Sequence, residues 1–259
     1  GTYNNIGLIY SGNLSKRKET EENYLKAKDI YEKLAKTNPE RFNSSLANIY
    51  NNIALFCMEC GDTENAGEYH MEAVRIRKKL ADENPERFSV DLSQSYCSIA
   101  MFYYNQGNNE NAKKYFHNAI AIMEKIVGLD PDSFNAHLAN IYNLIGSFYF
   151  NQRQPAEEKK YLEKAVELRE KLAGANPERF NAELAVSYNN IGAFYLSQQE
   201  DEEAEKYFGK AIEIYEKLVE KYPEIYNEAL AGIYGNTGFF CEKHYPEKAK
   251  EYYLKEMYI

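Results

Sequence analysis

The sequence lacks the features of membrane proteins and of disulfide-stapled secreted domains. No stretch approaches the roughly 20 apolar residues that a membrane-spanning helix needs, and no signal-peptide pattern precedes the first helical pattern. Four cysteines in 259 residues do not form a disulfide framework, which favours a reducing compartment. We therefore expect a cytoplasmic protein without membrane partners. Because residues 1–3 begin inside a repeat, we also expect the chain to be a fragment of a longer protein.

Clustered positive charge is also scarce. The formal net charge is −9, and the one compact basic run, residues 16–18, is followed directly by Glu19, Glu21 and Glu22. Proteins that bind nucleic acid through phosphates need clustered Lys and Arg. Nucleic acid is therefore not an expected partner.

Proline and glycine are few, at 7 and 14 residues, and they recur at regular intervals. Five prolines follow one another at a spacing of 46 residues: Pro39, Pro85, Pro131, Pro177 and Pro223. Self-similarity at a fixed period is typical of repeat architectures. No linker rich in Gly, Pro or Ser interrupts the pattern, so we predict a single array over 1–259, with approximate repeats 1–38, 39–84, 85–130, 131–176, 177–222 and 223–259.

Each period predicts two helices. Apolar residues recur at helical spacing over 46–57 and again over 66–80. Between these stretches, Gly61 can supply the left-handed end of one helix and Asp62 the cap of the next. The Asn-Pro pairs separate one period from the next, because the residue before proline is disfavoured in a helix. No strand signal appears, so the predicted fold class is all-α with six helix pairs.

Small residues recur at two helical positions where paired helices must approach closely. The fourth pair departs from the repeat: Arg153 stands at the glycine position and Glu158 at an alanine position. Pro155 is predicted to open the second helix of that pair as its first residue.

The pattern formed by Tyr50, Ile53, Ala54, Gly61, Ala66, Ala73 and a following proline resembles the tetratricopeptide repeat (TPR). The strings YNNIALFC at 50–57 and YNNIGAFY at 188–195 are most similar to the long repeats of kinesin light chain. This resemblance implies a right-handed α-solenoid of six helix pairs in which the first helices line the concave face.

Residues that could carry catalysis or bind metal do not form a recognisable motif. Cys57 and Cys60 make a lone CxxC, whereas structural zinc usually needs two such pairs, and a redox CxxC needs a βαβ setting. The four histidines fall in different repeat positions without a base or nucleophile motif beside them. We expect no enzymatic activity, no metal and no cofactor.

The first helices are nearly free of charge, since 43–58 and 133–152 contain no Asp, Glu, Lys or Arg. If they line the concave face as the resemblance implies, the groove is neutral and rich in asparagine, whose amide can pair with both polar groups of an extended backbone. In kinesin light chain the corresponding asparagines hold the cargo-peptide backbone, which implies the same use here. The predicted peptide-binding residues are Asn48, Asn51, Asn52, Met58, Met101, Tyr104, Asn140, Asn143, Phe150, Asn189, Asn190 and Leu196.

These observations predict a non-enzymatic scaffold that binds an extended peptide or a partner domain of another protein. One alternative is a self-assembly module that stacks into homo-oligomers through its ends, since neither end shows the polar capping helix that solenoids usually carry. Another is a regulatory sensor segment of a larger signalling protein.

Overall fold

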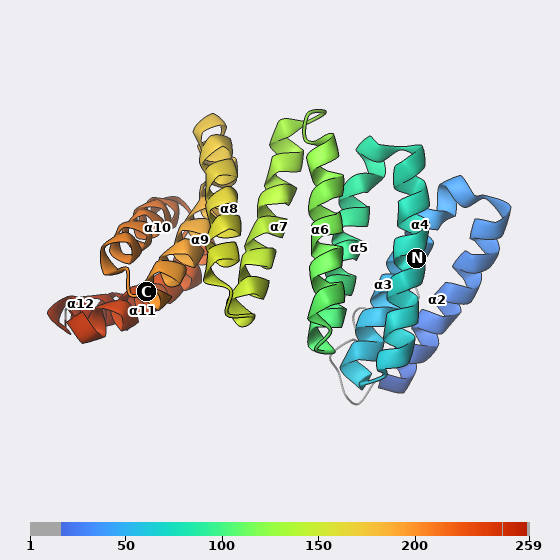
Figure 1. The fold of residues 1–259 in the computed structure, drawn as a ribbon, viewed down its shortest axis with the longest axis horizontal. Helices are drawn as coiled ribbons and strands as arrows, with labels where there is room; N and C mark the ends of the chain where they lie inside the picture. The colour runs from blue at the N-terminus through green and yellow to red at the C-terminus, as the bar shows by residue number, and fades with distance from the viewer. Residues whose placement is uncertain (1–16, 245, 258–259) are drawn as a thin grey trace. The chain divides into compact units, whose positions relative to one another are not determined.

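The computed structural model describes residues 17–244 and 246–257, which form α-helices joined by short turns (Figure 1). The chain divides into two compact units, Gly1–Phe134 and Asn135–Ile259. Unit 1 contains α2 (Arg17–Thr37), α3 (Pro39–Cys60), α4 (Thr63–Glu83), α5 (Pro85–Asn105) and α6 (Asn109–Ile126). Unit 2 contains nearly all of α7 (Pro131–Asn151), with α8 (Pro155–Ala175), α9 (Pro177–Ser197), α10 (Asp201–Lys221), α11 (Pro223–His244) and α12 (Pro246–Met257).

The described helices form consecutive pairs, which confirms the all-α solenoid class predicted from the sequence. Within unit 1 each helix packs against the next one along the chain, and α8 to α12 do the same in unit 2 (Figure 1). The first helix expected within 1–38 lies outside the described residues. The single uninterrupted array stays a prediction.

Asparagine and proline together start the first helix of several pairs. Asn38, Asn84 and Asn176 each accept a hydrogen bond at Oδ1 from the backbone N–H three residues on, at 3.2 Å. The proline that follows each of them occupies the first turn, where its missing N–H costs nothing. Pro155 likewise occupies the first turn of α8, as predicted, although Gln154 before it makes no side-chain cap hydrogen bond.

Small residues lie where the two helices of a pair touch, as the sequence indicated. Ala54 and Ala100 are fully buried at this position of unit 1. In unit 2 a Cβ added to Gly146 would lie 2.8 Å from Leu162, and one added to Gly192 would lie 2.9 Å from the Phe208 ring. Such distances are too short for a side chain, so the helices approach closely and bury the apolar residues between them.

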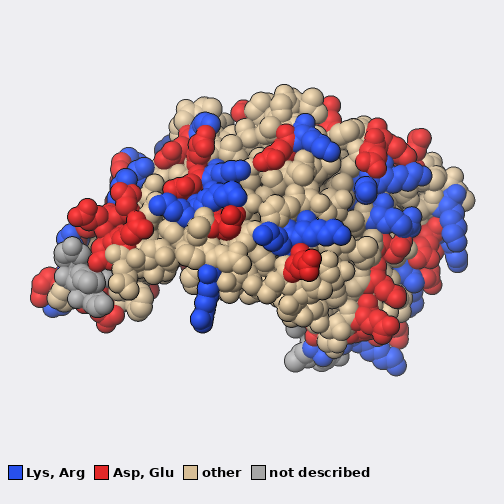
Figure 2. All heavy atoms as spheres, in the orientation of Figure 1, with Lys and Arg blue, Asp and Glu red and all other residues tan. Residues whose placement is uncertain are grey.

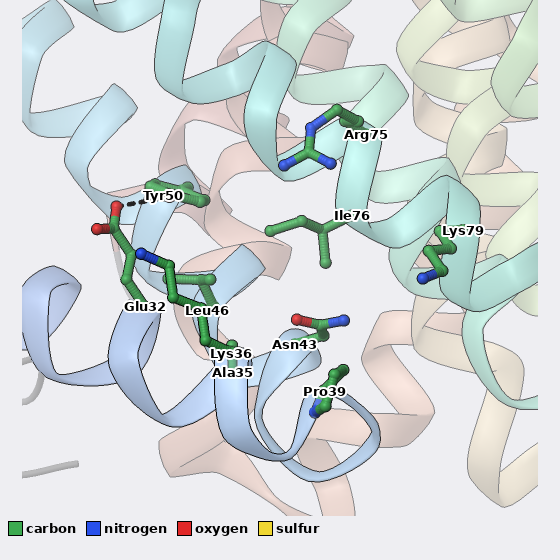
Figure 3. Close-up of a pocket in the computed structure, with 10 residues that line it drawn as sticks. All are labelled: Glu32, Ala35, Lys36, Pro39, Asn43, Leu46, Tyr50, Arg75, Ile76 and Lys79. Atoms are coloured by element: carbon green, nitrogen blue, oxygen red, sulfur yellow. Dashed lines mark hydrogen bonds between the residues drawn. The ribbon is translucent and has the colours of Figure 1, made fainter.

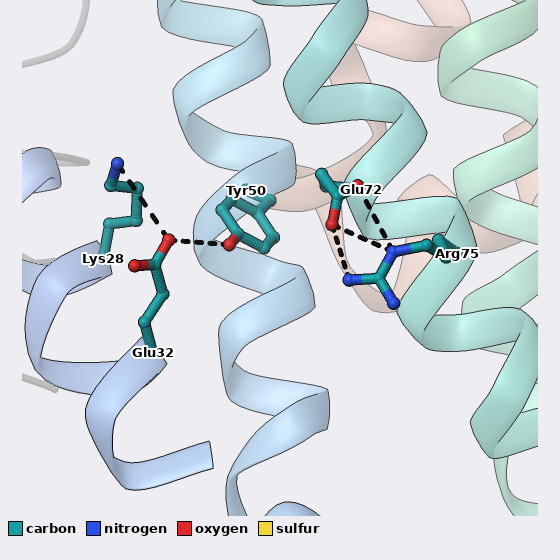
Figure 4. Close-up of polar contacts among 5 residues, drawn as sticks. All are labelled: Lys28, Glu32, Tyr50, Glu72 and Arg75. Atoms are coloured by element: carbon teal, nitrogen blue, oxygen red, sulfur yellow. Dashed lines mark hydrogen bonds and ion pairs between the residues drawn. The ribbon is translucent and has the colours of Figure 1, made fainter. Parts of the chain in front are cut away.

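A tyrosine and a glutamate connect successive helix pairs. The Tyr50 hydroxyl on α3 donates to Glu32 Oε1 on α2 at 2.8 Å (Figure 4). Tyr188 donates to Glu170 and Tyr234 to Glu216 in the same way, each at 2.6 Å. In each case a first helix is hydrogen-bonded to the second helix of the preceding pair, which fixes the stacking within a unit.

The charged side chains are mixed in sign. Lys and Arg lie close to Asp and Glu across the face drawn in Figure 2. Most of the ion pairs join residues three or four positions apart on one helix, such as Glu213 with Lys217 at 2.6 Å. No described helix combines the length and hydrophobicity needed to cross a membrane.

Candidate functional site

The most distinctive concave feature of unit 2 is a cavity of about 360 Å³, which we call the first-helix pocket. Three first helices, α7, α9 and α11, line it together with the second helix α8. The lining residues are Ser147, Phe150, Glu158, Leu162, Asn190, Ala193, Phe194, Leu196, Ser197 and Phe239. Nearly all of them are apolar or uncharged, as in a site for an apolar or amphipathic ligand.

Two aromatic side chains of this pocket are exposed without a covering element. Phe150 is 54% exposed near the end of α7, and Phe239 is 67% exposed on α11. Asn190 on α9 is half-buried beside them and brings an amide into an otherwise apolar surface. Exposed apolar side chains grouped on one surface are a common feature of ligand-binding and protein-binding sites.

Glu158 brings the one titratable side chain into the pocket lining. It lies in the first turn of α8 and is only 6% exposed. Burial raises the pKa of its carboxyl to about 7, and no nearby charge contributes to this shift. Its helix neighbours Glu157 and Lys160 pair with each other at 2.9 Å, so neither compensates it.

Three of the predicted site residues, Phe150, Asn190 and Leu196, meet in this one pocket. The sequence reasoning missed the contributions of Glu158 and Phe239. Phe239 occupies the repeat position of Ala193, one period earlier, so the periodicity could have found it. Glu158 was visible as a departure from the repeat but was not assigned to the site. The sequence predicted a neutral groove lined by first helices. The pocket differs from this expectation because the second helix α8 adds the carboxyl of Glu158.

Four other predicted asparagines are engaged within the protein. Asn48 and Asn140 accept hydrogen bonds from buried arginines of the second helices, Arg77 and Arg169 respectively. Arg77 also donates to the Asp91 carbonyl at 3.0 Å and to Ser95 Oγ. A buried guanidinium of the second helix in the same pair thus fixes each of these two asparagine side chains. Burial lowers the pKa of both arginine side chains.

The remaining two connect first helices of unit 2 with each other. Asn143 Nδ2 on α7 donates to Ser187 Oγ on α9 at 3.0 Å. Asn236 Nδ2 on α11 donates to Asn189 Oδ1 on α9 at 3.3 Å. These contacts help to align the helices that line the pocket.

The other five predicted residues lie on α3 and α5 of unit 1. All five, Asn51, Asn52, Met58, Met101 and Tyr104, are half-buried. Met58 packs against the apolar core, and the Asn51 Oδ1 atom is buried without a described hydrogen-bond donor. Whether any of them contacts a ligand stays a prediction.

The CxxC of unit 1 does not resemble a reactive thiol pair. Cys57 is half-buried, and burial raises the pKa of its thiol to about 11, whereas reactive cysteines have lowered values. Among the described residues, no three His, Cys, Asp or Glu side chains are grouped as metal ligands.

Unit 1 has a cavity of its own, of about 330 Å³, which we call the second-helix pocket (Figure 3). It lies between α2, α3 and α4, and it is lined by Glu32, Ala35, Lys36, Pro39, Asn43, Leu46, Tyr50, Arg75, Ile76 and Lys79. Its polar groups are largely satisfied: Arg75 donates to both Glu72 oxygens at 2.7 to 3.2 Å, and Tyr50 binds Glu32 (Figure 4). Four of its lining residues are charged, compared with one in the first-helix pocket. The second-helix pocket is therefore the less suitable of the two for an apolar ligand.

Models of the tetratricopeptide repeat match residues 47–80, 92–135 and 137–217. No curated protein matches the sequence.

Several solved structures share the fold. BtubC (BKLC) from P. vanneervenii is 20% identical with a TM-score of 0.73, over 92% of this chain and 88% of that one. Kinesin light chain TPR-like repeats from Podosopora anserina are 20% identical with a TM-score of 0.55, over 84% and 94%. Aspartyl phosphate phosphatase F from Bacillus subtilis is 14% identical with a TM-score of 0.62, over 99% and 68%.

Three repeat models distributed along the chain, paired helices and similar solved solenoids agree on one family. The family's fold is typically a scaffold for protein–protein interaction. The chain belongs to the tetratricopeptide-repeat family.

Proposed function

We propose that this chain is a non-enzymatic protein-binding module, and that unit 2 holds an extended segment of a partner protein at the first-helix pocket. The observation that carries the proposal is the pair of exposed rings, Phe150 and Phe239, at the edge of a cavity with one amide and one carboxyl. Buried aromatic anchors supply much of the affinity in protein interfaces, and a few polar groups fix orientation.

Asn190 contributes the polar side of this recognition. Its amide can donate to a backbone carbonyl of the partner and accept from a backbone N–H. One such hydrogen bond contributes about 0.5 to 1.5 kcal/mol, which is less than the burial of one aromatic ring. We therefore expect the rings to determine affinity and the amide to determine how the segment lies.

The test is a selection of displayed random peptides against the protein, followed by affinity measurements on purified variants. Phe239→Ser should weaken binding of a selected peptide by about 10- to 100-fold, because burying a Phe side chain contributes about 1.5 to 3 kcal/mol. Ile225→Ser is the matched control, since Ile225 lies on the same helix, is 66% exposed and is not part of the pocket.

If Phe239→Ser and Phe150→Ser both bind as tightly as the parent, the partner binds elsewhere. If Ile225→Ser weakens binding equally, the loss reflects general damage to α11. Circular dichroism should show the same helix content for all three variants.

Self-assembly is a second candidate, because α12 exposes Leu254 and Met257. Light scattering distinguishes the two functions: a mass near 30.1 kDa that does not change with concentration would exclude assembly.

A further inference from the structure

Glu158 occupies a repeat position that holds alanine in three other second helices. Ala66, Ala112 and Ala204 stand at this position in other pairs, and all three are fully buried. A methyl group is therefore sufficient for packing α8 against α7. The glutamate adds a carboxyl group that the helix pair does not need.

The Glu158 side chain is largely buried, its carboxyl group lines the pocket, and no described residue is hydrogen-bonded or ion-paired to that group. The side chains that face it from the other lining helices are uncharged: Ser147 and Phe150 on α7, Asn190, Phe194, Leu196 and Ser197 on α9, and Phe239 on α11. A buried charge without a partner is costly, and its energy falls when an opposite charge arrives. The pocket is thus poised for a cation.

The walls of the pocket restrict which cation fits. Phe150 and Phe239 offer exposed aromatic faces, and Leu162 and Leu196 offer aliphatic surface. Lysine and arginine side chains combine an apolar stem with a charged head, and both heads interact favourably with aromatic rings. A simple inorganic cation would leave the apolar surface uncovered.

We propose that Glu158 is the specificity-determining residue of the first-helix pocket and receives a lysine or arginine side chain of the bound partner segment. This inference rests on the proposed function, since it names the residue that the partner presents. The stem lies between the two phenylalanines, and the ammonium or guanidinium reaches the carboxylate beneath them.

The first experiment repeats the peptide selection with the parent protein, Glu158→Gln and Glu158→Ala. Glu158→Gln keeps the shape without the charge, and Glu158→Ala restores the residue that other pairs carry. Parent selections should be enriched in Lys or Arg at one position, and both variants should lose this enrichment. Using two variants guards against a folding defect in one of them.

The second experiment uses a selected peptide with an acetylated N-terminus, so that its amino terminus cannot supply the cation. Replacing the selected cationic residue by norleucine should weaken binding to the parent about tenfold or more. The same replacement should leave binding to Glu158→Gln almost unchanged, because the charge pair is already lost there. A double-mutant cycle on these four affinities measures the coupling.

The pH dependence provides an independent readout. Because a cation prefers the ionised carboxylate, affinity for the parent should fall as the pH drops through about 7, by at most about tenfold per unit. Binding to Glu158→Gln should lack this dependence. Lysine and arginine remain charged across that range, so the partner does not contribute to it.

Three results would overturn the inference. Parent selections rich in apolar residues without Lys or Arg would refute it and leave the proposed function standing. Affinity that rises as the pH falls would show instead that a protonated Glu158 donates a hydrogen bond to the ligand. A parent protein that selects no peptide at all would overturn the proposed function and this inference with it.

Discussion

Unit 1 buries a histidine and unit 2 buries a glutamate at a pair of repeat positions that are otherwise mostly apolar, but they do so at different members of the pair. Unit 1 has Ala66 followed by His70, and unit 2 has Glu158 followed by Leu162. His70 is 1% exposed, its ring centre lies 5.8 Å from that of Phe102, and its Nε2 atom has no described hydrogen-bond partner. Glu158 is also buried, but it lines an open pocket. A polar group at a core position becomes a site only where the neighbouring first helices leave a cavity above it.

The two burials have opposite electrostatic consequences. Burial lowers the pKa of His70 to about 4 and raises the pKa of Glu158 to about 7, because in each case it disfavours the charged form. His70 therefore makes stability rise with pH between about 4 and 6.5, since the unfolded chain binds the extra proton there. Glu158 makes stability fall with pH between about 4.5 and 7, since the folded chain holds the proton. The two contributions oppose each other.

Removing Glu158 should give the largest effect on this balance. Glu158→Ala should raise the free energy of unfolding at about pH 8 by about 1 to 3 kcal/mol, because the folded state no longer buries an unpaired carboxylate. The gain should shrink as the pH falls from about 7 toward about 4.5, because the parent carboxyl is then protonated in the folded state. Urea unfolding followed by circular dichroism measures it, and a pH-independent gain would show that packing, not charge, is responsible.

Replacing His70 should change the pH dependence of stability in the opposite direction to Glu158→Ala, and by a smaller amount. His70→Phe introduces the residue found at this position in Phe116 and Phe208, both fully buried. Between about pH 6.5 and pH 5 the parent should lose about 1 to 2 kcal/mol from the protonation of unfolded His70, and the variant should not. His117→Phe, at an exposed position, is the control. Equal acid sensitivity in the parent and His70→Phe would refute the buried neutral histidine.

Much of the fold could be predicted from the sequence, because the signals are local and repeat along the chain. Asn-Pro pairs start helices, Gly61 ends one, and small residues mark close helix contacts, so element type and order follow from a few positions. The site was harder to predict. Which first-helix side chains share a cavity depends on how three helices pack, and a linear pattern contains no such information.

Asparagines illustrate the difficulty most clearly. From the sequence alone, Asn48, Asn140 and Asn190 all fall on the helix face that was predicted to line the groove. In the structure the first two accept hydrogen bonds from Arg77 and Arg169, while Asn190 lines the pocket. The arginines lie on other helices, 29 residues away in each case, so helical periodicity could not reveal these contacts.

The turns between paired helices differ least between the two units: the backbone conformation is the same, and only the residue type changes. Unit 1 has Gly61 and Gly107 at this position, with φ of 79° and 72°. Unit 2 has Arg153 and Gln199, with φ of 54° and 62°. The hydrogen bonds are the same: the N–H of Asp62 reaches the Cys57 carbonyl at 2.8 Å, and the N–H of Gln154 reaches that of Tyr149 at 3.0 Å. Unit 2 thus keeps the left-handed helix end of unit 1 without glycine.

Substitutions at these left-handed helix ends should give the smallest measurable change in the free energy of unfolding. A residue with a Cβ pays about 1 to 2 kcal/mol in this region, and glycine recovers part of it while increasing the entropy of the unfolded chain. Arg153→Gly and Gln199→Gly should therefore each raise the free energy of unfolding by about 0.5 to 1 kcal/mol. Urea unfolding of the single variants measures both gains.

Alanine substitutions at two glycines, Gly61 and Gly174, provide a matched test of this backbone effect, because both positions have room for a methyl group. A Cβ added to Gly61 or to Gly174 would meet no atom within 4 Å, but only Gly61 has a positive φ. Gly61→Ala should destabilise the protein by about 1 kcal/mol, whereas Gly174→Ala, inside α8, should stabilise it by up to about 1 kcal/mol. Because neither methyl group would contact a neighbour, the difference in sign isolates backbone conformation from packing. Two changes of the same sign would mean that the helix ends of unit 2 are not strained, and that the arginine and glutamine there cost nothing.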